Sequence, residues 1–211
     1  MRTQRFHART ANAPGYTAIE VLLSMTVLAI GAAGVISMQK AAIQGNNDAR
    51  QLDTANAIAH TWMDRLRTDA TAWTLPSTLV ASSGTSNLVN TQWLNHALSV
   101  FFLPTAPATY PAEGYSAAFD NLGRDLDATD APTAVFCTHI KLEALYYDQA
   151  ANPLILNATV LVFWPKALLT SASPSASNCT TVFDVAAYEA AHPGTYHLVY
   201  LTSAIRKNPL Q

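Results

Sequence analysis

The feature that most constrains this chain is a run of 23 residues, 16–38, with one charged side chain, Glu20. As an α-helix the run would be about 34 Å long, enough to cross the roughly 30 Å hydrocarbon core of a bilayer. Three arginines and no acidic residue precede the run. Basic residues on one flank of a spanning helix keep that flank in the cytoplasm. The sequence therefore predicts a membrane-anchored protein whose later residues are exported.

Glu20 is the unusual residue of this run. An acid at the centre of a spanning helix costs about 2.5–3.5 kcal/mol, so intramembrane acids usually have a function. Pro14 and Gly15 interrupt the helix just before it, so the backbone there should be extended and accessible. Cleavage after Gly15 would create a positively charged amine on Tyr16. That amine would lie one turn from Glu20 in its own helix, and could meet the Glu20 of a staggered neighbouring helix.

The residues Gly15-Tyr-Thr-Ala-Ile-Glu20, followed by a long apolar helix, resemble the class III leader of type IV prepilins and type II secretion pseudopilins. The resemblance implies that a prepilin peptidase cuts the Gly15–Tyr16 bond and methylates Tyr16. It also implies that Glu20 guides the subunit into a filament. Tyr16 stands where the family usually has phenylalanine, and Ala18 where it usually has leucine.

Two simpler interpretations address the same run. An ordinary secretory signal could be cut near residues 32–34, which are small. Its apolar region, however, is usually about 7–15 residues long, and a carboxylate there would be unusual. A plain single-pass anchor leaves Glu20 unexplained. The prepilin interpretation accounts for the length, the basic flank and the acid together.

Composition limits the partners and the size of the exported part. The 211 residues include 12 basic and 14 acidic side chains, and loss of the three leader arginines would leave a net charge of −5. This balance does not predict a nucleic-acid partner. The roughly 170 residues after the apolar run are enough for one domain.

An amphipathic helical pattern continues after the apolar run. Because no proline occurs between Pro14 and Pro76, one helix over about residues 16–72 is allowed. Arg65 and Asp69 have the spacing of an i,i+4 ion pair. The predicted buried stripe consists of Leu52, Ala55, Ala59, Trp62, Leu66, Ala70 and Trp73. A second stripe predicts a short helix formed by Trp93, Leu94, Ala97, Leu98, Phe101 and Phe102.

Alternating residues predict strands at 115–119, 134–147, 154–164 and 196–205, and the two central strands read as an antiparallel hairpin. In the first strand of that hairpin, one face is apolar and the other is polar. The apolar face comprises Phe136, Ile140, Leu142, Ala144 and Tyr146, and the polar face comprises Cys137, His139, Lys141 and Glu143.

The predicted fold class is α+β, with a pilin-like fold. One long N-terminal helix, with a transmembrane half and an amphipathic half, packs on a small antiparallel β-sheet. The predicted organisation is a cleaved leader (1–15), a transmembrane half-helix (16–38), an amphipathic half-helix (39–75), a connecting region (76–114) and a sheet domain (115–211) with a long loop at 166–195.

Cys137 and Cys179 are the two cysteines, and both would be exported. A disulfide is favoured in an oxidising periplasm and would contribute about 3–4 kcal/mol. Since Cys137 falls on the predicted polar face, we expect the bond to fasten loop 166–195 over the outer side of the sheet. The resemblance agrees, because pilins commonly fasten a C-terminal loop in this way. Two free thiols are the alternative, because the sequence does not give their separation.

No cofactor, metal site or catalytic residue is predicted. Residues 120–130 are rich in aspartate, but EF-hand spacing fails because Thr129 takes a ligand position and Phe136 the closing glutamate position. A solvated turn is therefore preferred to a calcium site. The histidines lack H-E-x-x-H spacing, and no C-x-x-C occurs. The stretch 114–118 lacks the last glycine of a G-x-S-x-G motif. Trp62, Trp73 and Trp164 are assigned to the core.

The resemblance implies a minor pilin of the PilV type, which would help to prime the assembly of a type IV pilus. Its features are the uninterrupted anchor, the overall size and the sequence Asn-Ala-Ile-Ala-His-Thr-Trp-Met-Asp-Arg-Leu-Arg at residues 56–67. Major pilins often have a proline in the segment that residues 34–37 occupy here, so its absence favours a minor subunit.

The implied partners are other minor pilins, the major pilin, the prepilin peptidase and, as a further candidate, a tip adhesin. The implied location is the inner membrane with a periplasmic domain before assembly, then the pilus at the cell surface. The first alternative is a minor pseudopilin of the I type in type II secretion. The second is a membrane-anchored periplasmic enzyme or binding protein.

Overall fold

The computed structural model describes residues 15–74, 88, 91–96, 98–105, 115–126, 133–148, 152–166, 179, 182, 184, 187, 190 and 193–207. The predicted leader, except Gly15, lies outside the described residues, as does most of loop 166–195. The chain divides into two compact units, Met1–Asp48 and Ala49–Gln211. We describe each unit by itself.

The predicted long N-terminal helix is confirmed as α1, Ala18–Asp69, which has 52 residues. It starts two residues later than expected, and the short 3₁₀ helix η1, Ala72–Thr74, follows it. All residues from 18 to 48 are exposed. By length and composition, α1 is long and apolar enough to cross a membrane. An apolar helix surface of this size needs a partner or solvent other than water.

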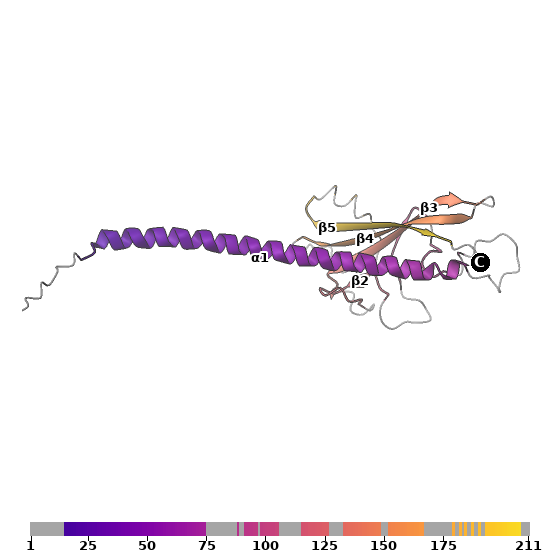
Figure 1. The fold of residues 1–211 in the computed structure, drawn as a ribbon, viewed down its shortest axis with the longest axis horizontal. Helices are drawn as coiled ribbons and strands as arrows, with labels where there is room; N and C mark the ends of the chain where they lie inside the picture. The colour runs from indigo at the N-terminus through magenta and orange to yellow at the C-terminus, as the bar shows by residue number, and fades with distance from the viewer. Residues whose placement is uncertain are drawn as a thin grey trace, which may run out of the picture. The chain divides into compact units, whose positions relative to one another are not determined.

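The predicted small antiparallel sheet is also confirmed, and it has five strands in the order β1-β3-β4-β5, with β2 pairing to β3 (Figure 1). The long strands β3, β4 and β5 contain many β-branched and aromatic residues, which favour extended backbone. The strands are β1 (Phe101–Phe102), β2 (Ala118–Phe119), β3 (Phe136–Tyr147), β4 (Pro153–Pro165) and β5 (Tyr196–Arg206).

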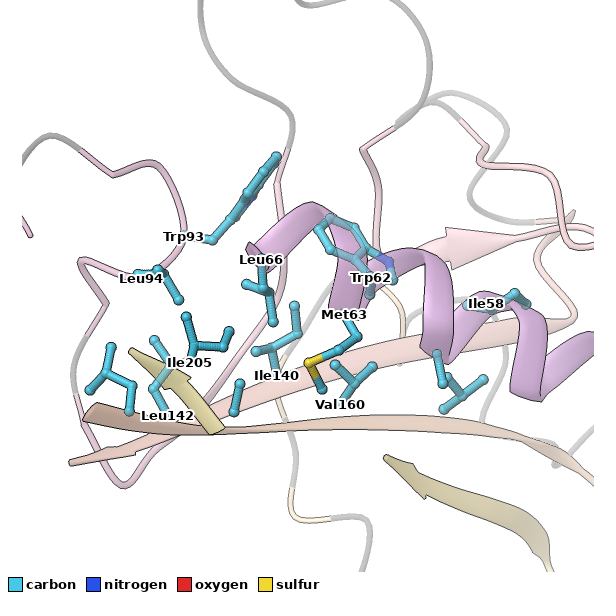
Figure 2. Close-up of a cluster of buried hydrophobic side chains, with 14 of the residues drawn as sticks. Ile58, Trp62, Met63, Leu66, Trp93, Leu94, Ile140, Leu142, Val160 and Ile205 are labelled. Atoms are coloured by element: carbon cyan, nitrogen blue, oxygen red, sulfur yellow. The ribbon is translucent and has the colours of Figure 1, made fainter. Parts of the chain in front are cut away.

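The main core lies between residues 55–66 of α1 and one face of the sheet (Figure 2). The predicted helix stripe is buried there except for Leu52, which is 45% exposed. Ile58 and Met63 are buried too, although the predicted stripe omitted them. The buried stripe is therefore wider than one residue every turn, because the face of the sheet contacts a broad arc of the helix. Trp62, Trp73 and Trp164 are all core residues, as predicted.

The face of the sheet opposite α1 holds a second apolar cluster. Its buried members are Ala118, Cys137, Leu161, Phe163, Cys179 and Tyr196. The predicted polar face of β3 is therefore wrong at this end, where Cys137 and His139 are both buried. His139 lies edge-on to the ring of Phe163, at 5.0 Å between centroids. The polar pattern holds only at the other end, where Lys141 and Glu143 form an ion pair of 2.8 Å.

A β-bulge overturns one further assignment in β3. Ala144 lies opposite Leu156, but Tyr146 lies opposite Ile155, so Leu145 is an extra residue in β3. A bulge of this kind reverses the alternation of side chains beyond it. Tyr146 is 61% exposed rather than part of the apolar face, and its neighbours Leu145 and Tyr147 are exposed too.

The short helix predicted around Trp93 is wrong. The described residues 91–96 and 98–100 form bends and turns, and Phe101–Phe102 form β1. The carboxylate of Asp69 accepts hydrogen bonds from the backbone N–H groups of Gln92, Trp93 and Leu94, at 2.7, 2.8 and 3.1 Å. Asp69 therefore does not form the predicted ion pair with Arg65, and its bonds instead tie this segment to the end of α1.

Candidate functional site

The start of α1 follows the predicted cleavage bond, Gly15–Tyr16, and contains the predicted assembly acid, Glu20. The backbone N–H groups of Glu20 and Val21 donate to the carbonyl of Thr17, at 3.0 and 3.3 Å. The N–H of Glu20 also lies 3.4 Å from Thr17 Oγ1. Thr17 is thus the N-cap, and Glu20 is the third helical residue. Thr17-Ala-Ile-Glu20 has the T-x-x-E spacing of a capping box, a signal present in the sequence that the sequence analysis missed.

The Glu20 side chain is exposed, and among the described residues nothing forms a hydrogen bond or ion pair with its carboxylate. Its place in the first turn gives it one favourable interaction, because a helix N-terminus carries partial positive charge. This interaction is worth about 0.3–1 kcal/mol in water and does not neutralise the acid. Within a bilayer, Glu20 would still require a proton or a cation from elsewhere.

Other polar side chains of the apolar segment bond to their own helix. The hydroxyl of Ser24 donates to the carbonyl of Glu20 at 2.7 Å. The hydroxyl of Thr26 donates to the carbonyl of Leu23 at 2.8 Å. Such internal bonds let hydroxyl groups enter an apolar medium at little cost. Glu20 differs from them because no group of the described helix pairs with its charge.

Gly15 has no structural reason to be glycine. A Cβ atom added at Gly15 would meet nothing within 4 Å. Among the described glycines, only Gly123 and Gly194 have the positive φ that disfavours other residues. Tyr16 is 83% exposed. The residues on both sides of the predicted cleavage bond are therefore accessible, and any requirement for glycine would come from another molecule.

The predicted disulfide is confirmed, with 5.0 Å between the Cα atoms of Cys137 and Cys179. Both cysteines are buried in the second apolar cluster rather than lying on a polar surface. The bond ties residue 179 of loop 166–195 to β3, on the sheet face opposite α1. The remainder of the expected fastening lies outside the described residues.

Side chains that could support other chemistry are dispersed. The described residues include no group of three or more metal-binding side chains. His96 stacks on Phe102 and His197 on Trp164, with ring centroids 4.0 and 5.1 Å apart. The Ser116 hydroxyl donates to the carbonyl of Ala118 at 2.8 Å. Gly114 of the G-x-S-x-G-like stretch lies outside the described residues.

The two described aspartates of the acidic loop are paired with arginines. Asp120 pairs with Arg124 at 3.0 Å, and Asp125 pairs with Arg65 at 2.6 Å. The pKa of Asp120 is lowered. Burial alone would raise it, but hydrogen bonds from two N–H groups of the turn and from the Arg124 guanidinium outweigh that effect. Asp127 and Asp130 lie outside the described residues.

Comparison of the chain with protein-family models, with curated proteins and with solved structures found no match. The described residues define only a class of protein. It is an α+β protein with one membrane-length N-terminal helix, a five-stranded antiparallel sheet and a disulfide.

Proposed function

We propose that this chain is a minor subunit of a type IV pilus, anchored in the inner membrane before it joins the filament. The observation that carries the proposal is the Glu20 carboxylate. It lies in the first turn of an exposed apolar helix, without a counter-charge among the described residues.

The proposed mechanism begins with removal of residues 1–15 by a prepilin peptidase. The cut releases an amine on Tyr16, which is then methylated and keeps its positive charge. The amine of one subunit pairs with Glu20 of its neighbour in the filament. Removing one partner of a buried ion pair typically costs about 3–5 kcal/mol, so a mismatched neighbour would be strongly disfavoured. The pairing thus sets the axial register of adjacent subunits.

Accessibility of the cleavage bond supports the first step. Gly15 and Tyr16 precede α1, and the open space around Gly15 leaves its backbone available to an enzyme. Once the leader is gone, residues 16–38 would be shielded from water by the bilayer and then by neighbouring helices. The sheet domain would form contacts with other minor pilins and the major pilin, and with a tip adhesin where one is present.

The experiment is mass spectrometry of the N-terminus of protein extracted from membranes of its native host. The expected result is N-methyl-Tyr16. An intact Met1, or a start beyond Ala32, would overturn the proposal. Gly15→Val should block the cut without affecting the fold, because no contact depends on this position. Gly45→Val is the matched control, since a Cβ there also meets nothing.

A second experiment separates the local and intersubunit roles of Glu20. Glu20→Gln keeps the size of the side chain but removes the charge, whereas Glu20→Asp keeps the charge. We expect normal processing of both variants and loss of filament incorporation in Glu20→Gln. Thr17→Ala controls for the cap alone. Full incorporation of Glu20→Gln would contradict the charge pairing.

A further inference from the structure

Beyond Tyr196, the outer edge of β5 presents backbone groups with no strand partner in the described part of the chain. β5 pairs with β4 along its whole length, Tyr196–Arg206, without a register shift. Among the described strands, β4 is its sole neighbour, which makes β5 an edge strand (Figure 1). An open edge strand is a ready template for a further strand.

The register shows which residues of β5 point their N–H and C=O groups away from β4. Beyond the two ends of the pairing, Lys166 N–H donates to the carbonyl of Thr195, and Lys207 N–H donates to the carbonyl of Leu154. Hydrogen-bonded pairs alternate along an antiparallel ladder, so the odd-numbered residues of β5 bond to β4. The even-numbered residues point their N–H and C=O groups to the outer edge. Beyond Tyr196 these are Leu198, Tyr200, Thr202, Ala204 and Arg206.

From residue 197 to residue 205, β5 lacks the residues and irregularities that protect many edge strands. Native sheets block open edges with lysines, prolines, bulges or very short strands. From residue 197 to residue 205, β5 has no Lys, Arg, Asp, Glu or Pro, and its register with β4 has no bulge. Tyr200, Thr202 and Ala204 are exposed. The basic side chains Arg206 and Lys207 lie at one end only.

We propose that the outer edge of β5 binds an extended strand of a partner protein, which adds to the sheet in antiparallel orientation. The backbone pattern requires an extended segment, because only such a segment can bond every second residue. The uncharged edge favours a partner strand without charges over most of its length. The exposed guanidinium of Arg206 favours a carboxylate at the N-terminal end of that strand.

A second copy of the chain does not fit this edge within the proposed function. Trp164, opposite His197, donates from Nε1 to Gln51 Oε1 at 3.1 Å, and Arg67 donates to Ser203 Oγ at 3.2 Å. β5 therefore runs in the same direction as residues 49–69 of α1. Symmetric pairing of two β5 edges is antiparallel and would reverse these helix segments. Copies within one filament all point the same way, which keeps these segments aligned, and this step rests on the proposed function.

The test uses the full chain in detergent micelles and the peptide acetyl-Glu-Val-Thr-Val-Thr-Val-Thr-amide. In the proposed register, its glutamate lies opposite Arg206 and its central threonine opposite Thr202. We expect saturable binding by fluorescence anisotropy of a labelled peptide, and slower hydrogen exchange at the outward amides of β5. A peptide with proline in place of the threonine opposite Thr202 lacks one donor, and we expect it to bind at least fivefold more weakly.

The matched protein variants are Thr202→Pro and Thr202→Ala. Both remove the hydroxyl that lies 3.5 Å from Thr159 Oγ1, but only proline also removes the outward N–H. A proline whose N–H would face away from the ladder is tolerated at a sheet edge. We expect Thr202→Ala to bind the peptide like the wild type and Thr202→Pro to lose at least fivefold in affinity.

Three results would overturn the proposal. They are absence of peptide binding, equal binding of the threonine and proline peptides, and dimerisation through β5 that Thr202→Pro abolishes. The peptide comparison changes no residue of the protein, so it stands even if Thr202→Pro fails to fold. None of these measurements depends on cleavage at Gly15. A failure of the edge proposal is therefore distinguishable from a failure of the proposed function.

Discussion

Arg65 of α1 and Asp125 near β2 form a two-pronged ion pair, with N–O distances of 3.0 and 2.6 Å. Their side chains are only 17% and 14% exposed. The Arg65 guanidinium also lies over the rings of Trp62 and Tyr115, at 4.7 and 5.0 Å from the centroids. This arrangement fastens the segment around β2 to the helix. The sequence spacing had instead predicted a partner for Arg65 within α1.

We expect Arg65→Met to lower the free energy of unfolding by about 2–4 kcal/mol, because it leaves the Asp125 carboxylate half-buried and unpaired. Chemical denaturation of the full chain in detergent, followed by tryptophan fluorescence, measures the change. Arg67→Met is the control, since Arg67 pairs with Asp64 on the surface and should contribute less than about 1 kcal/mol. Equal losses in the two variants would contradict the special role of Arg65.

The disulfide should contribute substantially to stability. It closes a loop of 42 residues, for which the chain-entropy estimate gives about 4 kcal/mol. We expect the double variant Cys137→Ala and Cys179→Ala, like the reduced wild type, to unfold at markedly lower denaturant concentration. The double variant should not respond to reducing agent. If reduction leaves the wild type unchanged, the bond is not constraining the unfolded chain as proposed.

Acid should weaken the fold partly through His96. Burial lowers the pKa of His96 from 6.5, and the nearby charge of Asp69 only partly offsets this. The folded state therefore binds fewer protons than the unfolded state, so stability is lost as the pH falls through 6.5 towards the lowered value. We expect His96→Gln to lose less stability than the wild type between about pH 7 and pH 5.

The control for this pH series is His60→Gln, because His60 lies on the exposed side of α1. Denaturant midpoints at several pH values provide the measurement. His60→Gln should follow the wild-type slope. An unchanged slope in His96→Gln would show that other groups account for the acid sensitivity.

The bulge in β3 predicts a contrast between two residues that sequence alternation assigned to one face. Leu142 is fully buried, and Leu142→Ala should cost about 2–5 kcal/mol through lost contacts and a cavity. Tyr146→Ser should change stability by no more than about 0.5 kcal/mol, because Tyr146 points to solvent. Thermal unfolding of both variants checks this. A large loss in Tyr146→Ser would mean that Tyr146 packs against the core in solution.

These elements show where sequence reasoning succeeds. The absence of proline and the apolar run predict α1, and three- and four-residue spacing predicts most of its buried stripe. Alternation predicts β3, β4 and β5 to within a residue or two. Each of these signals is local and repeats over ten or more residues, so single exceptions such as Leu52 do not obscure it.

The failures concern residues whose state depends on distant partners. The segment around Trp93 has helical spacing, but Phe101 and Phe102 at its end pair with β3, and its start is bound by the Asp69 carboxylate of α1. The side chain of Cys137 was assigned to a polar face by its neighbours, yet Cys179 and the rings around it make that end of the sheet apolar. No window of sequence contains both partners in either case.

The residues of the candidate site also differ in how well the sequence predicts them. Glu20 stands out from the sequence because charge in an apolar run is rare, and the helix-breaking pair Pro14 and Gly15 predicts the accessible backbone that the structure shows at Gly15. The cap formed by Thr17 was readable from its three-residue spacing to Glu20 but is a weak signal among several local threonines. The open edge of β5 could not be predicted, because edge position depends on the strand order of the whole sheet.

The three N–H groups bound by Asp69 have a practical consequence for labelling the protein. They hold residues 92–94 against the end of α1. The two ends of the stretch between them are therefore held together whatever its length. Doubling the length of such a stretch costs only about 0.6 kcal/mol of closure entropy. An epitope tag inserted between Trp73 and Leu88 should therefore leave the domain intact, and would allow the protein to be followed in cells.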